Sequence, residues 1–77
     1  MKAIVNGLKS LLGTEVKDLF QYSKTEINIM IFSLEDLDWI YTKTTQHILG
    51  MAEPYTLVRI NFINDKEEVL KSFDLLQ

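Results

Sequence analysis

The stretch from Glu26 to Phe32 constrains the possible folds more than any other part of this sequence. Side chains alternate there with the two-residue period of a β-strand, and both faces of the strand are largely apolar. One face carries Ile27, Ile29 and Ile31, and the other carries Asn28, Met30 and Phe32. Because a strand with two apolar faces must be covered at least in part on both sides, this segment is predicted to be a central strand of a sheet.

A helix is predicted directly after this strand. Ser33 followed by Asp36 resembles a capping box in which aspartate takes the place of glutamate, and further acidic residues suit the positive end of the helix dipole. Gly50 and Pro54 are expected to end the helix. Its apolar stripe is expected to consist of Leu34, Leu37, Tyr41, Thr44 and Ile48.

A second clear strand is predicted from Tyr55 to Ile63. One of its faces is apolar, and the other, which includes Arg59 and Asn61, is more mixed. Two strands joined by a helix of this length favour a parallel pair with a right-handed connection, because parallel strands need a long crossover. The region from Glu26 to Ile63 is therefore predicted to form a strand–helix–strand unit.

The flanking segments complete the prediction with less regular patterns. An amphipathic helix is predicted before Gly13, which can end it by adopting a left-handed conformation, and Gly7 inside it marks a close helix contact or is merely tolerated. Residues 14–22 fit a short helix capped by Thr14 or a strand, and the strand is favoured. A last helix is predicted to begin at Asp65, with Glu68 at its third position. The apolar stripe of that last helix is expected to be Val69, Leu70, Phe73 and Leu76.

These segments together predict an α+β fold. We expect a small two- or three-stranded mixed sheet packed by about three helices, in the order α-(β)-β-α-β-α. Residues 1–77 are expected to form a single compact domain, because a chain of this length is too short for two. The chain has no cysteine, so a well-filled core or self-association must supply the stability that disulfides supply in many domains of this size.

The groups that enzymes use for catalysis are sparse in this sequence. His47 is the only histidine, and its neighbours four residues away, Lys43 and Met51, do not form a metal-binding pair with it. No serine lies in a glycine-flanked elbow, and the three glycines are too far apart for a phosphate-binding loop. The acidic runs at 35–38 and 65–68 lie at predicted helix starts and lack the glycine of a calcium loop. We therefore expect no catalytic residues, no metal site, no cofactor and no enzymatic activity.

The overall charge bears on partners and on location. The net charge is −3 and the isoelectric point is near 4.9, which disfavours unspecific binding to nucleic acid or to anionic lipid. The N-terminus is too polar for a signal peptide, and no apolar run approaches the length of a membrane span. A cytoplasmic location is the expectation that remains.

Trp39 is the residue that points to a binding surface. On the predicted helix it faces away from the apolar stripe, and its neighbours one turn away are polar. A tryptophan on a polar face is typical of interface anchors, although another part of the same chain could equally cover it. The candidate partner-binding residues are Trp39, Glu35, Asp36, Lys43 and Gln46.

The function predicted from the sequence is that of a small binding protein. It would bind and regulate or inhibit a partner protein through the helix face around Trp39 and an acidic rim, and a partner with a basic surface would suit that rim. Homodimerisation through the same face is compatible with this role. One alternative is a nucleic-acid-binding module that uses the open sheet face, where Phe32 and Arg59 could contact single-stranded RNA. Another is a structural subunit of a larger assembly.

Overall fold

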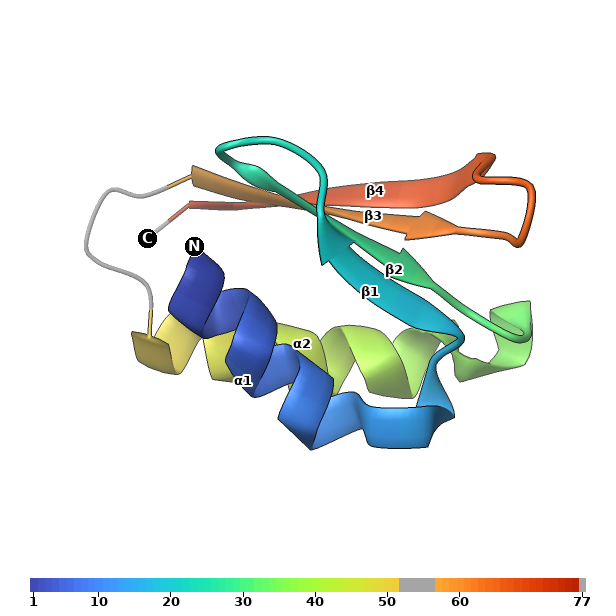
Figure 1. Ribbon diagram of the computed structural model, residues 1–77, viewed down its shortest axis with the longest axis horizontal. Coiled ribbons are helices and arrows are strands. Elements are labelled where there is room, and N and C mark those ends of the chain that lie inside the picture. The colour runs from blue at the N-terminus through green and yellow to red at the C-terminus, as the bar shows by residue number, and fades with distance from the viewer. Residues whose placement is uncertain (52–56, 77) are drawn as a thin grey trace.

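The structure is a computed structural model that describes residues 1–51 and 57–76. Two helices pack on one face of a four-stranded sheet, and no described helix covers the other face (Figure 1). The helices are α1 (Lys2–Leu12) and α2 (Leu37–Met51), and two short 3-10 turns are η1 (Gly13–Glu15) and η2 (Leu34–Asp36). The strands are β1 (Asp18–Gln21), β2 (Glu26–Met30), β3 (Leu57–Ile63) and β4 (Val69–Leu76).

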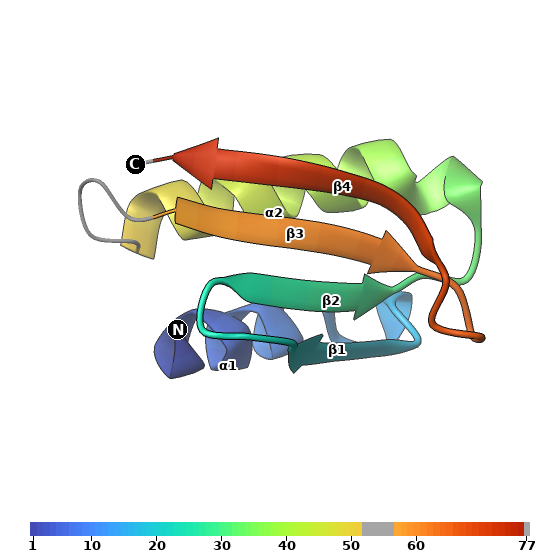
Figure 2. The same ribbon diagram turned by 90° about the horizontal axis from the view of Figure 1, so that it is seen from above.

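The strands lie side by side in the order β1-β2-β3-β4, as Figure 2 shows. β2 and β3 run parallel and are connected through α2, which confirms the predicted strand–helix–strand unit and the mixed character of the sheet. β1 pairs with β2 as an antiparallel hairpin, so the favoured strand within residues 14–22 is also confirmed. The observed class is α+β, in the order α-β-β-α-β-β.

The hydrophobic core fills the space between the sheet and the helices. Alternate residues of the two central strands point into it, with Ile27 opposite Ile60 and Ile29 opposite Phe62, and all four are fully buried. The predicted amphipathic helix is α1, which covers this face with Ile4, Val5, Leu8 and Leu12, whereas Leu11, which its spacing also placed in the stripe, is 45% exposed. Gly13 then ends α1 with φ 53° and ψ −127°, a conformation that a side chain would oppose.

The predicted last helix is wrong, because residues 69–76 form β4, antiparallel to β3. The segment that was expected to begin that helix is a hairpin turn instead. The side-chain Oδ1 of Asn64 accepts hydrogen bonds from the backbone N–H groups of Lys66 and Glu68, at 2.9 and 3.0 Å, so Asn64 rather than Asp65 organises the turn. Within residues 1–51 and 57–76 the sheet therefore has four strands instead of two or three, and there are two α-helices instead of about three.

The predicted helix around Trp39 exists, but its ends and its stripe differ in part. Ser33 caps the 3-10 turn η2 through Glu35 rather than a full α-helical box through Asp36. Leu34, which was expected in the apolar stripe, lies in η2 and is 64% exposed. Ile40, which was not expected there, is fully buried. Gly50 lies inside α2 and does not end it. Pro54, like Tyr55 and Thr56 of the predicted second strand, falls outside the described residues.

Candidate functional site

Trp39 lies near the N-terminal end of α2, held by two neighbours on the same helical segment. Its indole Nε1 donates a hydrogen bond to Oδ1 of Asp36 at 3.2 Å. The Nζ atom of Lys43 lies 5.2 Å from the centroid of the indole ring, within the range of a cation–π contact. Trp39 is partly buried and packs against the core, so the chain itself covers part of the ring and leaves the rest accessible.

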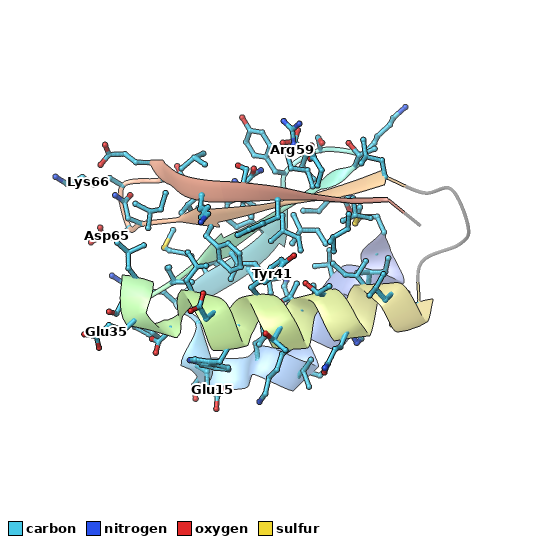
Figure 3. The ribbon with its side chains drawn as sticks, turned by 180° about the vertical axis from the view of Figure 1, so that it is seen from behind. Glu15, Glu35, Tyr41, Arg59, Asp65 and Lys66 are labelled. Carbon is cyan, nitrogen blue, oxygen red and sulfur yellow. The ribbon has the colours of Figure 1, made fainter. Side chains whose placement is uncertain are left out.

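Of the remaining predicted site residues, Glu35 and Asp36 lie in η2, and Lys43 and Gln46 lie in α2. Lys43 also lies 3.9 Å from a carboxylate oxygen of Glu15, which connects α2 to the turn after α1. Glu35 and Glu15 are labelled in Figure 3, where both lie on the helical side of the molecule. Gln46 is exposed, but it follows Trp39 by two helical turns, about 10 Å along the axis. The structure thus brings Glu35, Asp36, Trp39 and Lys43 together, and Gln46 lies at their margin.

Two exposed apolar side chains precede this group in the chain and were not among the predicted site residues. Phe32, in the segment between β2 and η2, is 61% exposed, and Leu34, in η2, is 64% exposed. We refer to Phe32, Leu34, Glu35, Asp36, Trp39 and Lys43 as the α2 corner. Exposed large apolar side chains with acidic residues nearby in the chain are typical of surfaces that bind another protein.

The uncovered face of the sheet carries a row of polar side chains across its strands. Asn28 of β2 lies opposite Asn61 of β3, and Asn61 lies opposite Ser72 of β4. Asn61 Nδ2 donates to Asn28 Oδ1 at 2.9 Å, and Ser72 Oγ donates to Asn61 Oδ1 at 2.6 Å. This face is therefore an ordered polar surface rather than a second apolar core.

Arg59, the basic residue on which the nucleic-acid alternative depends, is occupied by an ion pair. Its Nε and Nη2 atoms donate to the two carboxylate oxygens of Asp74 at 2.7 and 3.2 Å. These hydrogen bonds raise the pKa of Arg59 and lower the pKa of Asp74 from its ordinary value of 3.8. With its charge offset by Asp74, Arg59 offers little attraction to a phosphate backbone.

His47 lies in the interface between the two helices. A methyl group placed on Gly7 of α1 would come 2.5 Å from both Cε1 and Nε2 of the His47 ring, so the ring packs directly on the α1 backbone. Its Nε2 atom is buried and has no hydrogen-bond partner in the described part of the chain. Within residues 1–51 and 57–76, no three acidic or histidine side chains gather in a way that could hold a metal ion. Neither described helix is long and apolar enough to cross a membrane.

Comparison with known proteins adds no relative to this description. The chain matches no family model, no curated protein and no solved structure.

Proposed function

We propose that this protein is a small non-enzymatic binding module that regulates or blocks a partner protein by docking its α2 corner onto that partner. The observation that carries the proposal is the exposure of Phe32 and Leu34, 61% and 64%, in the segment that leads to the partly buried ring of Trp39. Side chains of this size lose contact with water when a partner covers them, which is the main favourable term in protein association.

The corner is ordered before any partner arrives. Trp39 is held by Asp36 and flanked by Lys43, and Ser33 fixes the turn that presents Leu34 by accepting the Glu35 N–H at 3.2 Å. A side chain that is already fixed loses little conformational entropy on binding, so more of the contact energy contributes to affinity. This order supports a docking role for the corner over a loose, unspecific contact.

The charges around the corner suggest what kind of partner fits. Glu35 and Asp38 are exposed and Asp36 is partly exposed, whereas the positive charge of Lys43 is shared with Glu15. A partner with an apolar pocket bordered by lysine or arginine would complement this arrangement. The partner would be a protein rather than a nucleic acid, because the acidic side chains would repel phosphates.

The experiment that tests the proposal compares two leucine variants of the same helical segment. Leu34→Asp should weaken partner binding at least about tenfold, because it places a charge at the centre of the contact. Leu49→Asp is the matched control, since Leu49 is 53% exposed but lies about 20 Å further along α2. Immobilised wild-type protein and both variants would be used to capture partners from cells, and each captured protein would then be titrated in purified form by calorimetry.

Only a partner that distinguishes the two leucines supports this role. A purified partner that binds wild type and Leu49→Asp equally, and loses affinity for Leu34→Asp, is the expected result. If every captured protein binds all three forms equally, the α2 corner is not the docking surface. Circular dichroism of both variants would verify that they keep the wild-type fold.

A further inference from the structure

The uncovered face of the sheet contains a hollow of about 480 Å³. Its lining includes Tyr22, Glu26, Asn28, Arg59, Asn61 and Glu67, which come from strands β2 and β3 and from the two hairpin turns. We refer to it as the sheet hollow. Figure 3 shows Arg59 on the side of the sheet away from α2, so the sheet hollow is separate from the α2 corner.

At the floor of the hollow each side chain donates a hydrogen bond to the next, from Ser72 on β4 through Asn61 on β3 to Asn28 on β2. Ser72 donates to Asn61, and Asn61 uses its two N–H groups on Asn28 Oδ1 and on Glu26 Oε1, the latter at 3.2 Å. The next residue of this row, on β1, is Phe20, whose side chain has no acceptor. The Nδ2 atom of Asn28 therefore ends the row as a donor without an acceptor among the described residues.

Asn28 is 94% buried by its neighbours, yet its amide nitrogen is not sealed inside the protein. The residue is 6% exposed, and the buried side-chain atoms without partners in the described chain are Thr44 Oγ1 and His47 Nε2 only. Asn28 lines the sheet hollow, and we infer that its free N–H groups open into that space. A buried amide held in this way is a fixed donor for a carbonyl oxygen of a ligand.

The charges of the hollow select a cationic ligand. Glu26 and Glu67 both line it, and the charge of Arg59 is offset by the bidentate pair with Asp74. The Glu26 carboxylate is held in place, because Asn61 donates to Oε1 and Ser23 donates to Oε2 at 3.1 Å, and each oxygen keeps a second lone pair. The ring of Tyr22, which is 64% exposed, adds an aromatic wall on which a cationic group can lie.

We propose that the sheet hollow binds a basic side chain together with its own peptide carbonyl, as presented by a short cationic segment of a partner protein. The guanidinium or ammonium group lies against Tyr22 and Glu26, Glu67 adds negative charge from the turn at the other end of the hollow, and the carbonyl oxygen accepts from Nδ2 of Asn28. The volume suits one side chain and the adjoining peptide group, which is at the small end of ligand sites. This inference does not depend on the α2 corner, which lies on the helical side of the sheet.

The test uses two capped tripeptides that differ in one charge. Gly-arginine-Gly is compared with Gly-citrulline-Gly, which has nearly the same shape but no charge, in an NMR titration of the isotope-labelled protein at low salt. We expect saturable shifts at the side-chain amides of Asn28 and Asn61 with the arginine peptide, at a dissociation constant of about 1 mM. The citrulline peptide should bind at least about tenfold more weakly, because a charged hydrogen bond is lost.

Matched variants separate this site from a general attraction to an acidic protein. Glu26→Gln and Glu67→Gln should each weaken the arginine peptide at least about fivefold, whereas Asp38→Asn removes the same charge on the helical side and should leave affinity within about twofold. Equal weakening by all three variants, or shifts that map outside the hollow, would overturn the proposal. Glu67 is exposed in a turn, so its variant remains informative even if Glu26→Gln unfolds the protein.

The Asn28 donor is tested by Asn28→Asp, in which the loss of the donor and the gain of negative charge have opposite effects on the affinity for the arginine peptide. Asn28→Asp keeps the acceptor for Asn61 and replaces the free donor by an oxygen, while it adds a negative charge. Methylguanidinium, which has no carbonyl, should then bind more tightly, and the arginine peptide should lose at least about threefold in affinity relative to methylguanidinium. If both probes gain affinity equally, Asn28 does not bind a carbonyl, and the proposal is wrong in that part.

Discussion

At the scale of single residues, the contact between Gly7 and His47 sets how closely the two helices approach. A glycine inside a helix costs about 1 kcal/mol relative to alanine, so its place in α1 needs a compensating reason. The structure supplies one, because a Cβ atom at residue 7 would come 2.5 Å from the His47 ring and only the sulfur of Met51, at 3.7 Å, would be an ordinary contact. Gly7 therefore marks a close helix contact, one of the two readings that its position in the sequence allows.

This contact predicts that the effect of Gly7→Ala changes sign with the residue at position 47. In the wild-type background we expect Gly7→Ala to lower the free energy of unfolding by about 1 kcal/mol, because displacing the His47 ring destabilises the protein more than the alanine stabilises the helix. In a His47→Ala background the same change should stabilise the protein by about 1 kcal/mol, since only the helical preference of alanine remains. Urea unfolding of the four proteins in this cycle measures both values. Equal effects in the two backgrounds would mean that the His47 ring does not restrict residue 7.

A second residue-scale prediction concerns Glu67, which has φ 62° in the turn between β3 and β4. A side chain in the left-handed region costs about 1–2 kcal/mol, and glycine avoids this cost. Glu67→Gly should therefore raise the free energy of unfolding by about 1 kcal/mol. The neighbouring Lys66→Gly serves as the control, because Lys66 does not have a positive φ and should gain nothing. Chemical denaturation of both variants measures the change in the free energy of unfolding. Equal changes at the two positions would argue against strain at Glu67.

At the scale of elements, the helices and strands with a clear local pattern are predicted correctly from the sequence. The prediction is wrong for β4, which depends on pairing with β3. The alternation at 26–32 and the spacing of α1 each allow one structure only. Val69, Leu70 and Phe73 fit a helical stripe equally well, and pairing with β3 decides for a strand. In the strand, the ring of Phe73 stacks on Tyr41 with the ring centroids 4.3 Å apart and contacts Phe62 edge-on with the centroids 5.9 Å apart. Those contacts come from residues far apart in the chain, so no local pattern reveals them.

The candidate site follows the same division between local and distant information. Leu34 fits the helical spacing of the predicted stripe, but it lies in the 3-10 turn η2 before α2 and is exposed. The contact of Trp39 with Asp36 follows from their three-residue spacing, whereas the packing of the Trp39 ring against the core does not follow from its angle on the helix. The free donor of Asn28, by contrast, depends on the residues opposite it, Phe20 of β1 and Asn61 of β3, and on Ser72 of β4, which lies opposite Asn61.

At the scale of the whole molecule, acid should act on stability through Asp74. The hydrogen bonds from Arg59 lower the pKa of Asp74 below 3.8 in the folded protein, whereas the unfolded chain keeps the ordinary value. The folded state therefore binds this proton less readily. The stabilisation is present in full above about pH 4 and is lost as the pH falls through the folded pKa. The net charge also turns positive below the isoelectric point near 4.9, which adds repulsion in the same range.

Asp74→Asn separates these two effects, because it removes the ion pair at every pH. The variant should be slightly less stable than wild type near neutral pH, and the difference should shrink and disappear as the pH falls below 3.8. Asp18→Asn changes the net charge by the same amount, so it corrects for the general repulsion. Thermal unfolding of the three proteins between pH 7 and about pH 2 provides the measurement. A difference between wild type and Asp74→Asn that stays constant over this range would show that the Arg59 pair does not contribute to the acid sensitivity of the fold.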